Sequence, residues 1–268
     1  MVPVATFRNI TIGQYIPGES LLHRLDPRTK ILVTLLMVVG LFFIDTYLGY
    51  GLAALYIALA IFRSGIPPRF LFRGLRPVII IILLTFALNS FMTEGEILWQ
   101  WSFLTLTKEG LSKGGMLAIR LILLIVGTSI LTLTTSPLAL TDGLEKLLRP
   151  GKRIGIPAHE LAMMMTIALR FIPTLLEETE KIMKAQMARG ADFESGNLLQ
   201  RAKSLLPLLV PLFVSAFRRA DDLAVAMEAR CYRGGEGRTK LKQLAFQAVD
   251  FLVLGGSLVF IIWLALSM

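Results

Sequence analysis

Residues that build catalytic centres and covalent cross-links are scarce in this chain. Its 268 residues include one cysteine and two histidines. The single thiol, Cys231, excludes an intrachain disulfide framework and any CxxC site. His23 and His159 have no Cys or Glu pattern of metal-ligand spacing around them, so we expect structural roles for both and no bound metal.

Catalytic and nucleotide-binding motifs are missing as well. The phosphate-loop pattern GxxxxGK[ST] does not occur, and the nearest glycine-rich basic stretch, 234–240, lacks its spacing. The metalloprotease motif HExxH and the hydrolase motif GxSxG are also absent. The sequence therefore predicts a protein that is not an enzyme and that binds no cofactor of its own.

Charged residues make up only 18% of the chain and apolar residues 54%, against about 25% and 45–50% in soluble domains. The apolar residues form uncharged runs at 31–44, 46–62, 77–93, 121–141 and 251–268. A membrane helix needs roughly 17–25 mainly apolar residues, which the last four runs supply and the first reaches with its polar ends. The composition predicts an all-α polytopic membrane protein with about five transmembrane helices.

The predicted spans hold essentially no ionisable residue at mid-depth and show no evident inverted repeat. Proton relays, ion pathways and stand-alone carriers usually need intramembrane charge or such repeats. These absences favour a connector over a pore. A stand-alone secondary transporter, a membrane enzyme and a membrane anchor for another cytoplasmic complex are the alternatives.

The formal charge of +9 is distributed asymmetrically. Basic residues precede the first span and fill the 63–76 link, whereas the 45–51 link has no Lys or Arg. The positive-inside rule then places the N-terminus, the 63–76 loop and everything after the fourth span in the cytoplasm. The first thirty residues are polar, so we expect no cleavable signal. The charge thus predicts orientation in the cell membrane and not nucleic-acid binding.

Four parts follow from these runs. They are a cytoplasmic segment at 1–30, four transmembrane helices at 31–136, a cytoplasmic or membrane-surface region at 137–243, and a last span at 244–268. The third part is charged but contains the apolar pieces 161–169 and 205–214. Because these pieces are too short or too broken by proline to span, they suit helices that lie along the membrane or pack on the spans.

The 137–243 region predicts two long amphipathic helices. Pro157 favours a helix start near His159, and an apolar period near 3.6 continues to about Arg189. Gly190 can then end this helix in a left-handed cap. A second pattern starts near Asn197 and stops at Arg230. The prolines inside the two patterns, which predict kinks and candidate hinges, are Pro173, Pro207 and Pro211.

Both predicted helices end on an arginine between small residues, in the stretches MARGADF (187–193) and MEARCYRGG (227–235). An arginine at this position complements the helix dipole, for roughly 0.3–1 kcal/mol. The similar neighbours, the small flanks and the cytoplasmic side favour a second role. A guanidinium is a rigid fork of five donors that matches carboxylates or carbonyls in a groove. Two similar ends predict a partner that is present twice.

Five segments resemble the transmembrane T component of energy-coupling factor (ECF) transporters. They are GQYIPGESLLHRLDPRTK (13–30), TTSPLALTDGLEKLLRP (134–150), RIGIPAHELAMMMTIALRFIPTLLEE (153–178), MKAQMARGADF (183–193) and FRRADDLAVAMEARCYRGG (217–235). The resemblance covers nearly the whole chain. It implies a scaffold that joins two cytoplasmic ABC-type ATPase subunits, which bind ATP and Mg²⁺, to one small substrate-binding membrane protein, the S component, for uptake of vitamins or metal ions.

In that family two Ala-Arg-Gly motifs at the ends of coupling helices dock into grooves of the two ATPases. By motif match they map to Ala188, Arg189 and Gly190, and to Ala229, Arg230 and Cys231. Cys231 departs from the usual glycine, so we expect the second left-handed cap at Gly234 instead. The resemblance also implies that the apolar pieces 161–169 and 205–214 receive the S component, which would itself determine the substrate.

Overall fold

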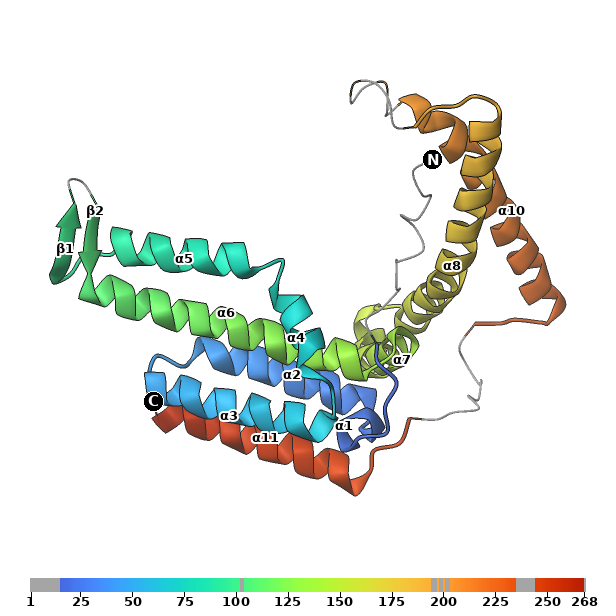
Figure 1. The fold of residues 1–268 in the computed structure, drawn as a ribbon. Coiled ribbons are helices and arrows are strands. Elements are labelled where there is room, and N and C mark those ends of the chain that lie inside the picture. The colour runs from blue at the N-terminus through green and yellow to red at the C-terminus, as the bar shows by residue number, and fades with distance from the viewer. Residues whose placement is uncertain are drawn as a thin grey trace. The chain divides into compact units, whose positions relative to one another are not determined.

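The structure, a computed structural model, describes residues 15–101, 104–193, 197, 200, 203–234 and 244–267 (Figure 1). The chain divides into two compact units. The bundle unit consists of Gly13–Leu147 and Lys242–Met268, and the paired-helix unit contains Leu148–Leu241. Each unit is described by itself.

Among its described residues, the regular structure of the bundle unit is helical apart from one antiparallel pair of strands. Its elements are α1 (Leu21–Arg24), α2 (Pro27–Phe42), α3 (Tyr47–Ser64), α4 (Pro68–Leu75), α5 (Ile79–Met92), β1 (Ile97–Trp101), β2 (Leu104–Thr107), α6 (Lys108–Thr134), α7 (Pro137–Leu148) and α11 (Ala248–Ser267). Helix α6 packs against α2, α3, α4 and α5, and α11 packs against α2. The main core therefore gathers buried side chains from α2, α3, α6 and α11. The antiparallel pair β1–β2 was not expected from the sequence.

The bounds of one predicted span, 121–141, differ from those of the helices. Residues 121–134 of this range lie in α6 and residues 137–141 lie in α7. Helix α6 begins at Lys108 because the Thr107 hydroxyl accepts a hydrogen bond from the Gly110 N–H at 3.1 Å and caps the helix. The predicted 63–76 loop contains α4, and α4 meets α5 at a bend of 59°. By contrast, the predicted span at 46–62 agrees with α3, whose N-cap is Thr46.

Three helices, α3, α6 and α8 (Ala158–Ala188), are long and apolar enough to cross a membrane, and α4 with α5 adds a fourth if the bent pair is one span. Helix α11 is a shorter apolar helix. The fold is thus that of an all-α polytopic membrane protein, as the composition predicts. Helix α8 agrees with the long helix predicted from about His159 to Arg189, and it is also long and apolar enough to span, which was not expected of the piece 161–169.

Arg120 is a charged residue inside a helix that is long and apolar enough to span. It lies inside α6, and its side chain is only 17% exposed. Its Nε donates to the Tyr50 hydroxyl at 2.7 Å and its Nη2 donates to the Ile44 carbonyl at 2.9 Å. Asp45 lies 3.5 Å away as an ion-pair partner. Because these partners satisfy the guanidinium, Arg120 ties the link between α2 and α3 to α6.

The basic N-terminal segment makes contacts that the sequence did not predict. Asp26 caps α2, and burial raises its pKa, but the hydrogen bonds and charge of Arg28 outweigh this and leave the pKa of Asp26 below its ordinary value. The Asp26 N–H donates to the Asp250 carboxylate at 2.9 Å, which joins the start of α2 to the first turn of α11. The Lys30 ammonium donates to the Thr134 carbonyl at 3.1 Å, at the end of α6. This segment therefore fastens three helices of the bundle unit together.

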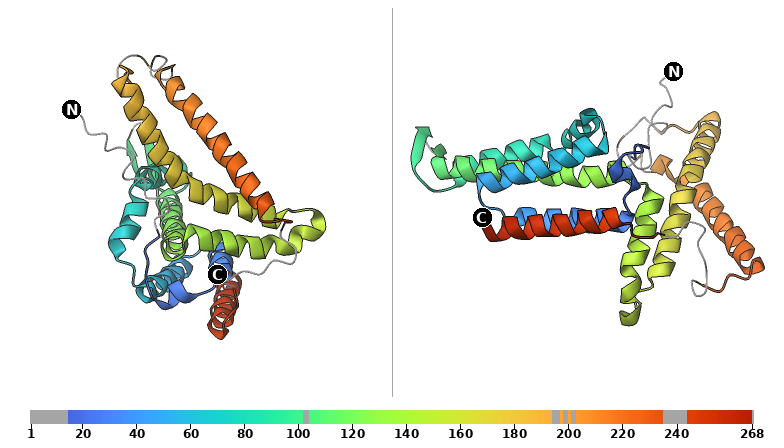
Figure 2. Two further views of the ribbon diagram at one scale, coloured as in Figure 1. Left: turned by 90° about the vertical axis from the view of Figure 1, so that its right-hand side faces the viewer. Right: turned by 90° about the horizontal axis from the view of Figure 1, so that it is seen from below.

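The paired-helix unit contains η1 (Arg149–Ile154), α8 and α10 (Leu206–Ala229). Pro157 is the N-cap of α8, as expected, and Pro173 lies inside this helix, which changes direction along its length (Figure 2). Pro211 lies inside α10. Pro207 lies in the first turn of α10, just after a turn at Leu205 that separates helical residues 203–204 from α10.

Candidate functional site

The two arginine-bearing helix ends have the same backbone conformation. Arg189 follows the last residue of α8 with φ −89° and ψ 6°, and Arg230 follows the last residue of α10 with φ −89° and ψ 12°. In each case the next residue is left-handed, with φ 87° at Gly190 and φ 56° at Cys231. The similarity of the two short sequences is therefore also a similarity of geometry.

Two backbone hydrogen bonds of one motif close each end. The left-handed residue donates its N–H to the carbonyl three positions earlier, at 2.9 Å after α8 and 2.8 Å after α10. The following residue donates its N–H to the carbonyl five positions earlier, at 3.0 Å in both. These are the bonds of a Schellman motif, which satisfy carbonyls that the helix end would otherwise leave unpaired. The predicted left-handed cap at Gly190 is confirmed.

Cys231 corrects the expectation that only Gly234 would be left-handed after α10. Both residues have positive φ, and Cys231 is the one non-glycine residue with positive φ among the described residues. A left-handed conformation costs a residue with a Cβ roughly 1–2 kcal/mol. The two Schellman bonds compensate for this cost, so a small side chain is held where glycine is the usual residue.

We expect opposite effects on stability from Gly190→Ala and Cys231→Gly. A Cβ at Gly190 would meet nothing within 4 Å, so alanine would be penalised only by its backbone, by about 1–2 kcal/mol. Cys231→Gly removes that same penalty but also raises the entropy of the unfolded chain. The free energy of unfolding is therefore expected to rise by less, under about 1 kcal/mol. Thermal unfolding of the purified chain in detergent measures both changes. A Gly190→Ala chain as stable as the natural one would contradict the backbone argument.

Both arginine side chains are accessible. The six residues of the two motifs are all exposed, namely Ala188, Arg189, Gly190, Ala229, Arg230 and Cys231. Within the described part of the chain, neither guanidinium makes a hydrogen bond or an ion pair. Ten N–H donors, five from each arginine, are therefore available to an acceptor outside this chain.

Helices α8 and α10 run antiparallel, so the two arginines lie at opposite ends of the pair. The Gln186 side chain near the end of α8 donates to the Pro207 carbonyl at the start of α10, at 3.3 Å. Tyr232, just after α10, shares a hydrogen bond of 3.3 Å with His159 at the start of α8. The 24 residues of α10 span about 36 Å at 1.5 Å per residue. The arginine ends are thus separated by roughly one helix length, which suits two separate grooves and not a single one.

Large apolar side chains on both helices are left uncovered. On α8 they are Leu161, Met164, Met165 and Ile172, and around the first turns of α10 they are Leu205, Leu206, Leu209, Val210, Phe213, Val214 and Phe217. Phe213 is 60% exposed and Phe217 is 70% exposed. Contiguous exposed apolar surface of this kind is typical of contact with a partner or with lipid. It coincides with the apolar pieces that the sequence analysis singled out.

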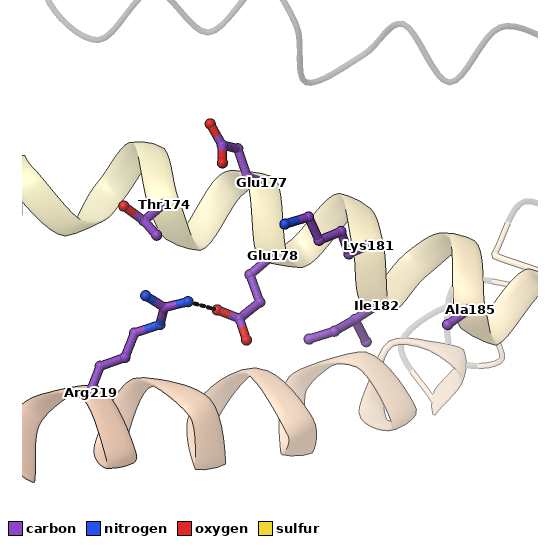
Figure 3. Close-up of a pocket in the computed structure, with 7 residues that line it drawn as sticks. All are labelled: Thr174, Glu177, Glu178, Lys181, Ile182, Ala185 and Arg219. Carbon is purple, nitrogen blue, oxygen red and sulfur yellow. Dashed lines mark hydrogen bonds and ion pairs between the residues drawn. The ribbon is translucent and has the colours of Figure 1, made fainter. Parts of the chain in front are cut away.

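The sequence analysis missed the charged contact that joins α8 to α10. The i,i+4 spacing favours the pairs Glu177–Lys181 and Glu180–Lys184, but neither occurs among the ion pairs of the described residues. Glu178 instead pairs with Arg219, which lies 41 positions further along the chain (Figure 3). A local pattern contains no signal for such a distant partner.

The fold and these helix ends define a membrane-embedded protein that presents a matched pair of exposed arginines. Residues 18–241 match the family described as CbiQ, cobalt transport protein, and the chain belongs to this family. It is 62% identical over 264 residues to the energy-coupling factor transporter transmembrane protein EcfT of Thermosediminibacter oceani, covering 96% of this chain and 100% of that protein. The proteins of the same description from Ruminiclostridium cellulolyticum and Bacillus subtilis are 58% and 51% identical, covering 97% and 92% of this chain and 97% and 93% of theirs.

These comparisons confirm the resemblance to the T component of ECF transporters. The chain is therefore the transmembrane component of an energy-coupling factor transporter, and this family of components is not itself catalytic.

Proposed function

We propose that the chain is the scaffold and energy-coupling subunit of an ECF-type importer for a vitamin or a metal ion. In this proposal Arg189 and Arg230, with their small neighbours, dock into two cytoplasmic ABC-type ATPase subunits that bind ATP and Mg²⁺. One small membrane protein, the S component, binds the substrate. The chain itself carries no cofactor and performs no catalysis.

The observation that carries this proposal is the equivalence of the two helix ends. Two arginines with one backbone geometry, both exposed, lie at opposite ends of an antiparallel helix pair. Two copies of one kind of groove, such as a pair of homologous ATPases supplies, would be complementary to this arrangement. The arginine fork would bind carboxylates or backbone carbonyls in each groove.

Energy would be transmitted through the helices that carry these arginines. When ATP closes the ATPase pair, the grooves move, and α8 and α10 follow them as levers. Pro173 and Pro211 lie inside these helices and are the bend points of this proposal, because proline removes a helical hydrogen bond. The exposed apolar surface of α8 and α10 would then move beneath a docked S component.

Co-purification from membranes without crosslinking tests the composition. The tagged chain is expected to bring down two ATPase chains and one small membrane protein per copy. If the chain catalyses uptake alone in proteoliposomes, it is a stand-alone transporter and the proposal fails. Recovery with a different cytoplasmic complex, without ATPases, would instead support a membrane anchor.

A further inference from the structure

The contact between α8 and α10 is a small polar cluster with three members. The Arg219 Nη2 donates to the Glu178 Oε2 at 2.7 Å, and the Ser215 hydroxyl donates to the Glu178 Oε1. The side chains of Glu178 and Arg219 are 23% and 39% exposed, so both are partly shielded from solvent. Figure 3 shows the two side chains reaching toward each other from facing helices.

The cluster lies halfway between the two arginine ends. Glu178 precedes Arg189 by eleven residues on α8, and Arg219 precedes Arg230 by eleven residues on α10. At 1.5 Å per residue, each arginine is about 16 Å from the cluster along its own helix. Because the helices are antiparallel, the two ends lie on opposite sides of the contact.

The two helices leave a space beside this contact. An open cavity of about 340 Å³ lies beside the ion pair, lined by Thr174, Glu177, Lys181, Ile182 and Ala185 together with the pair itself. Close packing, which normally fixes the separation of two helices, is therefore incomplete here. The Glu178 carboxylate, with two donors from α10, bridges the helices beside this cavity, between the end contacts Gln186–Pro207 and Tyr232–His159.

We propose that Glu178, Arg219 and Ser215 hold α8 and α10 at one spacing, so that the two helices move together and the distance between Arg189 and Arg230 is fixed. We call these three residues the pivot. The proposal rests on the proposed function, because a fixed distance matters when two partners are engaged at once. Two linked binding sites reinforce each other only when their geometry allows simultaneous contact. The three residues are thus positioning residues that act through the arginine ends.

A distance measurement on the full chain in lipid nanodiscs tests the pivot. Spin labels are attached to Lys184→Cys on α8 and Ala226→Cys on α10, two exposed positions, in a Cys231→Gly background. Double electron–electron resonance is expected to give one narrow distance distribution. Glu178→Ala should broaden this distribution. Glu177→Ala is the matched control and should leave the distribution narrow, since the Glu177 side chain points away from Arg219 (Figure 3).

The charge exchange Glu178→Arg with Arg219→Glu separates a specific contact from general damage. This double exchange is expected to restore the narrow distance distribution, because the ion pair can form with its two charges exchanged between the helices. An unchanged distribution in Glu178→Ala overturns the pivot. A broadened distribution that the exchange does not narrow overturns it as well, because the loss would then not depend on the pair.

Binding to the ATPases links the pivot to function. In the Glu178→Ala chain the affinity for the ATPase pair is expected to fall by about tenfold or more, because the two ends no longer engage together. The Glu177→Ala control should bind as the natural chain does. An unchanged affinity in Glu178→Ala overturns the role in positioning. Failure of the natural chain to bind ATPases would contradict the proposed function, and the label distances would still decide the pivot.

Discussion

Replacing both Arg189 and Arg230 by alanine is expected to abolish substrate uptake and to uncouple ATP hydrolysis from transport. Both side chains are exposed and bond to no described residue, so their removal costs the chain only the helix-dipole contribution, roughly 0.3–1 kcal/mol each. Membrane insertion and the melting temperature should therefore change little. The proposed loss comes from the grooves of two ATPases, which no longer receive a guanidinium. Uptake by cells or reconstituted vesicles, together with recovery of bound ATPase, measures the effect.

Matched variants sharpen this test. Arg233→Ala removes another exposed basic residue near the same end of α10 and should retain uptake. Arginine-to-lysine changes at both docking positions should be poorly tolerated, since an ammonium cannot reproduce the planar fork. Each single alanine variant should weaken the contact with one ATPase and leave the contact with the other ATPase unchanged. Normal uptake in the double alanine variant would show that these ends do not couple.

The ends of α8 were predictable because they depend on local chemistry. Pro157 has no backbone N–H to donate to a preceding helical turn, so it suits the start of a helix. Gly190 readily adopts the left-handed conformation that follows the end of the helix. The left-handed conformation of Cys231 was not predicted, because the prediction considered only the preference of glycine for this conformation. It did not include the two backbone hydrogen bonds that end α10. Those bonds outweigh the preference, and the second end repeats the geometry of the first.

Polar residues inside the fold were the hardest to predict. Arg120 directly precedes the apolar run that starts at residue 121, and α6 begins thirteen residues before that run. Its partners are on α3 and in the link between α2 and α3. Asp26 and Asp250 are bonded across 224 positions of the chain. Periodicity reports which face of a helix is apolar, but it contains nothing about such distant partners.

Replacing Phe213 and Phe217 of α10 together by aspartate is expected to remove the S component while the ATPases remain bound. The two side chains are 60% and 70% exposed, so their loss costs the isolated chain little packing. If a partner buries them, each contributes about 1.5–3 kcal/mol to binding. A combined loss of about 3–6 kcal/mol corresponds to at least a hundredfold weaker association.

Co-purification of the assembled complex from membranes measures this separation of partners. Arg218→Asp is the matched control, since it adds negative charge to the next position of α10 without removing apolar surface. It should retain the S component, and the amount of chain in the membrane fraction should be the same for both variants. Recovery of the S component at its normal yield with the double aspartate variant would place its docking surface elsewhere. A reduced amount of chain in the membrane would show instead that lipid covers this face, because inserting the two aspartates into the bilayer is energetically unfavourable.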